Sequence, residues 1–134
     1  KNPNFCDERN LLSISKALQD VDIIHSSFEK CLKYAKEGDF LYLDPPYYPI
    51  SKTSSFTNYT KEDFGIEHQI NLFKVFNDLN NLSCKIMLSN SYSEFVINLY
   101  KDYRKVTLNA KRAINCDAKK RGIIKEILIL NDFQ

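Results

Sequence analysis

The segment Phe40-Leu41-Tyr42-Leu43-Asp44-Pro45-Pro46-Tyr47-Tyr48 decides the fold predicted for this chain. Its first four residues are apolar and predict a short buried strand. Pro45 and Pro46 end that strand, because proline fixes φ and lacks an N–H donor, and they hold the next carbonyl groups in one stiff geometry. Asp44 is therefore expected at the carboxyl edge of a sheet, where open α/β sheets bind their ligands.

The residues after this strand suit the binding of a planar base that carries an exocyclic amine. Such an amine is a poor nucleophile, because its lone pair is delocalised into the ring. The Asp44 carboxylate and the Pro45 carbonyl can each accept one amine hydrogen and stabilise the positive charge that develops during attack. Tyr47 can stack on the base, a contact worth ~1–3 kcal/mol, with Tyr48 or Phe56 as further apolar walls. A base in a duplex must be flipped out to enter such a pocket.

A simpler interpretation is that the motif is only a turn after a strand. Asp-Pro turns are common, but four specified residues directly after an apolar strand favour a functional motif. The predicted catalytic residues are therefore Asp44, Pro45, Pro46 and Tyr47.

The motif resembles the catalytic Asp-Pro-Pro-Tyr sequence of the amino-group DNA methyltransferases, which use S-adenosylmethionine. The next residues, Pro49-Ile50-Ser51-Lys52-Thr53-Ser54-Ser55-Phe56-Thr57-Asn58-Tyr59, resemble the continuation found in the Dam-type adenine-N6 group. Further matches, in the order of that family, are Lys1-Asn2-Pro3, Ser27-Phe28, Leu88-Ser89-Asn90 and Lys111-Arg112-Ala113-Ile114. The resemblance covers nearly all of the 134 residues.

This resemblance implies methyl transfer from S-adenosylmethionine, without a metal, to N6 of a flipped adenine in double-stranded DNA. It implies that Ser27 and Phe28 contact the adenine of the cofactor and that Asp44 lies at its methyl end. A helix cap explains Ser26 and Ser27 equally well. The resemblance also favours a phosphate contact for Ser51.

Two parts of the resembling family are expected to be missing from this sequence. The family builds its cofactor turn from Phe-x-Gly-x-Gly, whereas the glycines here are Gly38, Gly65 and Gly122, far from one another. In Dam-type proteins this turn and the DNA-recognition domain precede the matched region. Residues 1–134 are therefore expected to be the C-terminal part of a methyltransferase catalytic domain, with the missing N-terminal half of the same enzyme as a partner.

Helix and strand patterns alternate along the chain. Helices are expected over residues 7–19, 26–37, 60–80 and 91–100, and strands over residues 21–24, 40–43, 85–89, 105–108 and 123–130. The alternation predicts a mainly parallel α/β sheet, and the last two strands, joined without a helix, predict an antiparallel pair at its edge. The resemblance implies the same arrangement, a partial Rossmann-like methyltransferase sheet. In the third helix the expected core residues are Ile66, Ile70, Phe73, Phe76 and Leu79, with His68 on the surface.

Basic residues concentrate near the C-terminus. Nine of them lie between residues 101 and 125, against two acids, although the net charge of the chain is only +2. A solvated face is the usual meaning of such a run, but beside a base-flipping motif phosphate contacts gain weight. The hydroxyl-rich loop of residues 48–60 fits phosphate contacts or a flexible surface loop. The expected DNA-binding residues are Ser51, Lys52, Thr53, Lys111, Arg112, Lys119, Lys120 and Arg121.

The composition argues against several other classes of protein. Hydrophobic residues make up 43% of the chain, enough for the core of one domain, and no run approaches the ~20 apolar residues that span a bilayer. The first residues lack a signal peptide. Without Cys-x-x-Cys spacing and with two histidines, a zinc site is not expected. The widely spaced cysteines predict reduced thiols in the cytoplasm.

Three functions remain open at this level. The first is an adenine-N6 DNA methyltransferase, and the second is a non-catalytic remnant of such an enzyme that still binds nucleic acid. The third is a methyltransferase for another planar amine, such as cytosine N4 or a protein amide. Asp44 in the first motif position and the continuation over residues 51–59 favour adenine.

Overall fold

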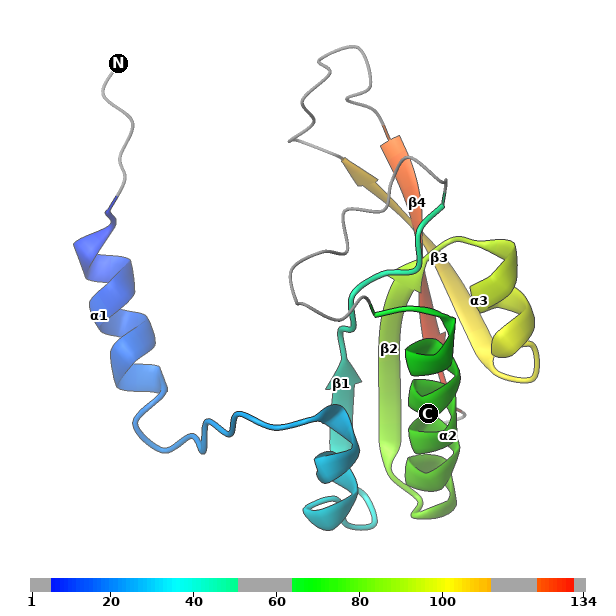
Figure 1. The fold of residues 1–134 in the computed structure, drawn as a ribbon. Helices are drawn as coiled ribbons and strands as arrows, with labels where there is room; N and C mark the ends of the chain where they lie inside the picture. The colour runs from blue at the N-terminus through cyan, green and yellow to red at the C-terminus, as the bar shows by residue number, and fades with distance from the viewer. Residues whose placement is uncertain (1–5, 51–63, 112–122, 132–134) are drawn as a thin grey trace.

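The computed structural model describes residues 6–50, 64–111 and 123–131 (Figure 1). It is an α/β structure, as the alternation of patterns predicted. Its elements in chain order are α1 (Glu8–Ala17), the 3-10 helix η1 (Phe28–Lys33), β1 (Phe40–Leu43), α2 (Ile66–Asn81), β2 (Lys85–Ser91), α3 (Glu94–Leu99), β3 (Arg104–Lys111) and β4 (Ile123–Leu130).

The four described strands form one mixed sheet in the order β1-β2-β4-β3. β1 pairs parallel with β2, whereas β4 pairs antiparallel with both β2 and β3. The expectation of a mainly parallel sheet is therefore wrong for these strands, because β4 lies between β2 and β3. The antiparallel pair of the last two strands is confirmed, with β3 at the edge. β1, β2 and β3 still run in the same direction, so their carboxyl ends meet at one edge of the sheet.

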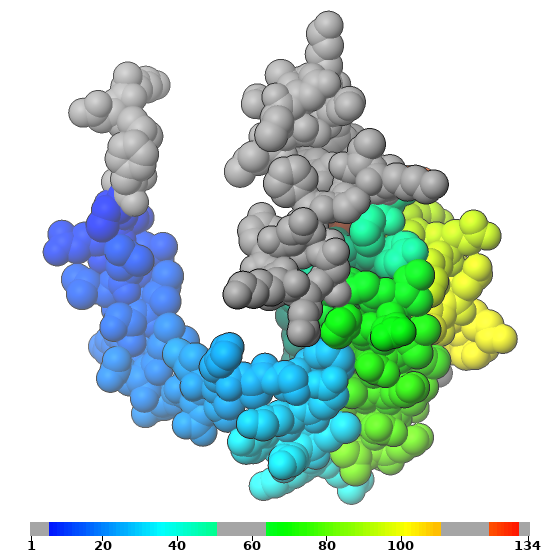
Figure 2. Space-filling model, viewed as in Figure 1, coloured from blue at the N-terminus to red at the C-terminus, as the bar shows by residue number. Residues whose placement is uncertain are grey.

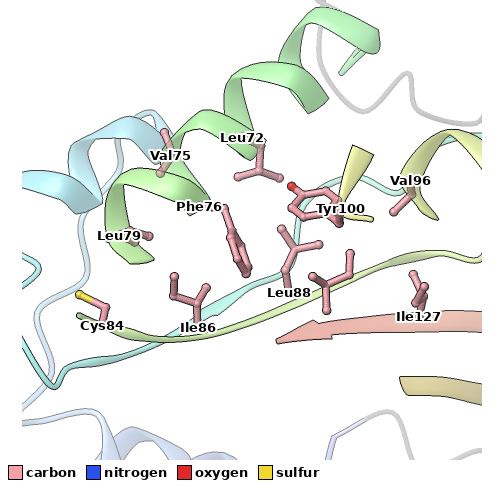
Figure 3. Close-up of a cluster of buried hydrophobic side chains, with 11 residues drawn as sticks. Leu72, Val75, Phe76, Leu79, Cys84, Ile86, Leu88, Val96, Tyr100 and Ile127 are labelled. Atoms are coloured by element: carbon pink, nitrogen blue, oxygen red, sulfur yellow. The ribbon is translucent and has the colours of Figure 1, made fainter. Parts of the chain in front are cut away.

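The helices α2 and α3 cover one face of this sheet, and the core fills the space between them and the strands (Figures 1 and 3). Its buried side chains include Leu72, Val75, Phe76 and Leu79 of α2, Ile86 and Leu88 of β2, Val96 of α3, Tyr100 directly after α3, and Ile127 and Ile129 of β4. In β4 and the first half of β2 the buried residues alternate, since successive side chains point to opposite faces, whereas the last four residues of β2 are all buried. This packing holds α2 alongside β2, over the face of the sheet (Figure 1).

The buried stripe of α2 differs from the expected one in its first half. Ile66 and Ile70, expected in the core, are exposed by 50% and 37%, and Gln69, Leu72 and Val75 are buried instead. The expected stripe was drawn through apolar residues only, so it missed Gln69, a polar residue at a core position. The second half of the expected stripe does face the core.

The first residues of α3 also differ from the expectation. Ser93 is the N-cap, and its Oγ accepts a hydrogen bond from the Val96 N–H at 3.3 Å. Ser91, expected as the first residue of this helix, instead ends β2, where it pairs with Glu126 of β4. Its hydroxyl is buried and has no hydrogen-bond partner among the described residues.

The segment before β1 contains α1 and η1 but lacks the expected strand over residues 21–24. α1 is confirmed as a helix, capped by Asp7, yet it buries none of its side chains and stands apart from the sheet (Figures 1 and 2). Residues 21–24 are exposed and have no regular structure. A strand needs a neighbour that pairs with its backbone groups, and the described sheet supplies none here.

Candidate functional site

Asp44 lies directly after β1, at the edge where the carboxyl ends of three strands meet. Its side chain is exposed. Ser89 of β2 donates a hydrogen bond from Oγ to Asp44 Oδ1 at 2.7 Å, and the same hydroxyl lies 3.5 Å from the Leu43 carbonyl oxygen. A short bond from a hydroxyl to a carboxylate is among the stronger hydrogen bonds. It orients the carboxylate and leaves the second oxygen, which has no partner among the described residues, available to a ligand.

Tyr47 shares this edge with Asp44. Its side chain is half-buried, and this burial raises the pKa of the phenol, while a hydrogen bond with Ser89 lowers it. The nearby carboxylates of Glu126 and Asp44 add to the rise in pKa. The phenol is therefore neutral near pH 7, and its ring offers an uncharged surface beside the carboxylate. Ser89 donates to Asp44 and also lowers the pKa of Tyr47, so it lies near both predicted catalytic side chains.

Two buried amide side chains hold the backbone of the motif. Gln69 of α2 donates from Nε2 to the Pro46 carbonyl at 3.0 Å. Asn90 of β2 accepts at Oδ1 from the Tyr48 N–H at 2.9 Å, and its Nδ2 donates to Gln69 Oε1 at 3.1 Å. Both amides are 0% exposed. The motif is thus hydrogen-bonded to a helix and a strand that lie far from it in the sequence.

Neither amide was given a role by the sequence patterns, although a signal for each was present. Asn90 continues the alternation of Ile86 and Leu88, so it faces the same side of the sheet as the core. Gln69 lies three residues before Leu72 on the buried side of α2. Buried polar groups are almost always hydrogen-bonded, so a polar residue in an apolar register predicts such a partner.

Tyr48, one of the two expected walls of the base pocket, packs against the helix α3. Its ring stacks on Phe95, with the centroids 4.5 Å apart and 26° between the planes. Its N–H is bound by Asn90. The other expected wall, Phe56, lies outside the described residues.

Ser27 and Phe28, the predicted contacts of the cofactor, lie at the start of η1. Phe28 packs edge-on against Phe64 with the centroids 6.0 Å apart, and Phe64 stacks on the ring of His68 at 5.2 Å. His68, expected on the surface, is half-buried. Ser27 is the N-cap by position, but its side chain makes no capping bond; it is hydrogen-bonded to Glu29 and lowers the pKa of that carboxyl. No hydrogen bond or ring contact among the described residues joins this group to the Asp-Pro-Pro-Tyr motif.

Two lysines of the C-terminal basic cluster interact with other groups of the protein. Lys105 donates from Nζ to the carbonyl groups of Tyr100, Lys101 and Tyr103 at 2.7–2.8 Å, and so satisfies the carbonyls after α3. The Nζ of Lys125 lies 5.6 Å from the ring centroid of Tyr92.

The predicted DNA-binding segment begins at the same sheet edge as the motif. Lys111 pairs with Ile123 at the end of the β3–β4 ladder, whereas β2 ends at Ser91, opposite Glu126. The β3–β4 pair therefore extends beyond β2 at the edge that carries Asp44. The other predicted contacts, namely Ser51, Lys52, Thr53, Arg112, Lys119, Lys120 and Arg121, lie outside the described residues, as does the side chain of Lys111.

Several general properties of the described chain bear on the site. Within residues 6–50, 64–111 and 123–131, no three His, Cys, Asp or Glu side chains gather where they could hold a metal ion. None of the helices in these ranges is long and apolar enough to cross a membrane. Cys31 and Cys84 are free thiols, and burial raises the pKa of both.

Comparison with known proteins identifies a family with these features. The family described as D12 class N6 adenine-specific DNA methyltransferase matches residues 1–114, which include the whole motif and β2. The chain is 46% identical over 134 residues to the type II methyltransferase M.MjaIII of Methanocaldococcus jannaschii. It is 41% identical over 133 residues to the type II methyltransferase M1.LlaDCHI of Lactococcus lactis, and 25% identical over 130 residues to the DNA adenine methylase of Escherichia coli K12.

The chain spans about half the length of the curated relatives it matches. The alignment with the Methanocaldococcus protein covers 98% of this chain and 46% of that relative. The corresponding shares are 98% and 47% for the Lactococcus protein, and 97% and 46% for the Escherichia protein.

Proposed function

The chain belongs to the D12 class of N6 adenine-specific DNA methyltransferases, and we propose that it carries the catalytic motif of an enzyme that methylates N6 of adenine in DNA. The observation that carries this proposal is the grouping of Asp44, Ser89 and Tyr47 at the carboxyl edge of the sheet. An exposed, oriented carboxylate beside a neutral aromatic ring suits a flipped base with an exocyclic amine.

In the proposed reaction, Asp44 and the Pro45 carbonyl accept the two hydrogens of the adenine amine. The Pro46 carbonyl is bound by Gln69, whereas the Pro45 carbonyl has no partner among the described residues. The two acceptors stabilise positive charge on the amine nitrogen as it attacks, which is when the charge develops. Tyr47 stacks on the base and keeps it out of the duplex.

S-adenosylmethionine supplies the methyl group when it is bound. The described residues suit part of this molecule: the Phe28 and Phe64 rings offer an apolar surface, and Asp44 offers a carboxylate for the positively charged methyl end. The Phe28–Phe64–His68 group includes the first turn of α2, and the next residue, Gln69, binds the motif. We assign Ser27, Phe28 and Asp44 to the cofactor site on these grounds.

Double-stranded DNA is the proposed partner of the loop between β3 and β4 and of the loop after the motif. Neutralising phosphates with Lys and Arg contributes affinity without reading sequence. The support from the fold is that β3 and β4 extend beyond β2 at the edge of the sheet that carries Asp44.

The remainder of the proposed enzyme is a second partner. Leu11 and Leu12 of α1 are exposed by 56% and 65%, and Ile23 is exposed by 80%. Several large apolar side chains exposed along one segment are typical of a surface that another part of a protein covers. We propose that residues 1–134 form the C-terminal part of the catalytic domain. The remaining half would cover α1, extend the sheet at β1 and supply the glycine-rich cofactor turn.

The test is to replace Asp44 in the protein at its full natural length. Asp44→Ala should lower the single-turnover rate of adenine methylation by about 100- to 1000-fold, as expected for loss of a preorganised charge-stabilising group. Asp78→Ala, which removes an exposed carboxylate from α2, is the matched control and should keep the wild-type rate. A near-normal rate for Asp44→Ala would refute the proposed role.

A further inference from the structure

We propose that Gln69 and Asn90 are positioning residues, which fix the peptide groups on both sides of Tyr47 before a base arrives. The inference rests on the proposed function, because it gives these residues a task in base capture. It is carried by three hydrogen bonds that converge on the motif from a helix and a strand.

The geometry brackets Tyr47 on both sides. The Pro46 carbonyl belongs to the peptide group that enters Tyr47, and it accepts from Gln69 Nε2 at 3.0 Å. The Tyr48 N–H belongs to the peptide group that leaves Tyr47, and it donates to Asn90 Oδ1 at 2.9 Å. Because peptide groups are planar, fixing both of them fixes φ and ψ of the residue between them. The direction in which the Tyr47 ring leaves the backbone follows from these two angles.

The two amides also hold each other in place. Asn90 Nδ2 donates to Gln69 Oε1 at 3.1 Å, and Asn90 Oδ1 accepts a further bond from the Ser91 N–H at 2.8 Å. Both side chains are 0% exposed, so water does not compete for these bonds. A buried network in which each polar atom has a partner is rigid, whereas a network that loses one member leaves costly unpaired groups.

The same network selects the carbonyl that is left for a substrate. Gln69 binds the Pro46 carbonyl, while the Pro45 carbonyl has no partner in the described chain. The pair of amides therefore leaves Asp44 and the Pro45 carbonyl as the acceptors at this edge and directs the next carbonyl into the protein.

Asn131 is a buried amide of the same kind that binds only the fold. It is 6% exposed; it accepts from the Ile86 N–H at 2.7 Å and donates to Asn80 Oδ1 and the Cys84 carbonyl at 2.8 Å. These partners lie at the opposite end of β2 from the motif. Loss of its amide should therefore lower stability without altering Tyr47, which makes Asn131→Leu a matched control.

The experiment uses the protein at its full natural length and two measurements made well below the unfolding temperature of each variant. The first is the ¹⁹F NMR spectrum of the protein with 3-fluorotyrosine in place of Tyr47, which reports how well the ring is ordered. The second is the single-turnover rate of adenine methylation. In Gln69→Met and Asn90→Leu the fluorine signal should move toward that of the unfolded chain. The rate should fall by about 10- to 100-fold, the equivalent of one or two unpaired buried groups.

A conservative variant separates positioning from stability. In Gln69→Glu the protonated carboxyl can still donate to the Pro46 carbonyl, but the ionised carboxylate cannot. Relative to wild type, its methylation rate should fall as the pH rises through the pKa of the new carboxyl, which burial raises. Asn131→Leu should lower the unfolding temperature and leave the fluorine signal and the rate unchanged.

The outcomes distinguish this inference from the proposed function. An unchanged fluorine signal in Gln69→Met and Asn90→Leu overturns the positioning role, whatever the enzyme does. A wild-type protein that orders Tyr47 through these residues but methylates no DNA supports the positioning role and refutes the proposed function. Loss of rate in Asn131→Leu equal to that in Gln69→Met, with both proteins folded, also overturns the inference.

Discussion

The hydroxyl of Ser89 donates a 2.7 Å hydrogen bond to Oδ1 of Asp44. Ser89 is only 3% exposed, whereas Asp44 reaches solvent, so a rigid donor inside the sheet orients a carboxylate at its surface. A side chain that acts on a substrate works best when a neighbouring residue fixes its orientation. The orientation of the Asp44 carboxylate therefore depends on Ser89 of the neighbouring strand β2.

Ser89→Ala removes this bond and should reduce the single-turnover methylation rate by at least about tenfold, since hydrogen bonds to charged groups contribute ~1.5–3 kcal/mol. The matched control is Ser13→Ala. It removes a hydroxyl that donates to the Arg9 carbonyl at 2.9 Å within α1, and it should keep the wild-type rate. Equal rates for Ser89→Ala and wild type would show that Asp44 needs no support from β2.

Tyr47→Ala should weaken capture of the flipped base, whereas Tyr47→Phe should change it little, because stacking requires only the ring and contributes ~1–3 kcal/mol. The measurement is the fluorescence of an adenine analogue at the target position in a duplex, which rises when the base leaves the stack. If Tyr47→Phe is as defective as Tyr47→Ala, the hydroxyl and its bond with Ser89 matter more than stacking.

Replacing Lys119, Lys120 and Arg121 by alanine should lower DNA affinity by a similar factor for all duplex sequences. The slope of log affinity against log salt should become shallower by ~0.9 for each lost phosphate contact. A triple replacement of the exposed Lys30, Lys33 and Lys36 removes the same charge from another part of the surface and serves as the control. Equal slopes for both triple variants would mean that the C-terminal cluster is a solvated face.

Tyr100→Phe should stabilise the fold. The Tyr100 hydroxyl is buried without a hydrogen-bond partner in the described part of the chain. Removing such a group recovers its desolvation cost, ~1 kcal/mol or more in the free energy of unfolding. Tyr103→Phe is the contrasting variant, because it removes a 2.6 Å hydrogen bond from the Tyr103 hydroxyl to Asn77 Oδ1 and should destabilise. Chemical denaturation of both proteins measures the two changes, and a destabilised Tyr100→Phe would contradict the assignment.

Tyr100 also predicts how the stability of the fold depends on pH. Burial raises the pKa of Tyr100 well above its ordinary value of 10.0. Above about pH 10 the unfolded chain releases this proton while the folded chain keeps it, so stability present below that pH is lost as the pH rises. Tyr100→Phe should reduce this alkaline loss, measured as unfolding free energy between about pH 8 and pH 11.

The position of the strand before Asp44 was predictable because its signals are local, but its expected burial is wrong, since Phe40 and Tyr42 are exposed by 57% and 54%. Four apolar residues followed by an acid and two prolines specify a strand and its end without help from the rest of the chain. The second half of the α2 stripe and the apolar run of β4 were predictable for the same reason. The Asp-Pro-Pro-Tyr motif is contiguous in sequence, so it could be recognised together with the strand that it follows.

The parts that were wrong depend on partners distant in sequence. Residues 21–24 have a strand-like composition but no neighbour with which to pair. The position of β4 between β2 and β3 comes from pairing between strands, which periodicity does not encode. Gln69 and Asn90 were overlooked because their task depends on a bond between α2 and β2.

Ser89 and Asn90 are consecutive in β2, and their side chains leave the strand on opposite faces, one toward the Asp44 carboxylate and the other toward the Tyr48 amide. A slip of β2 by one residue against β1 would exchange the two faces and break both attachments together, and it would also turn Ile86 and Leu88 out of the core. The register of β2 therefore determines both the packing of the core and the positions of Asp44 and Tyr48. A misregistered molecule should be inactive as well as unstable, and recovery of methylation during refolding would report the pairing of β1 with β2.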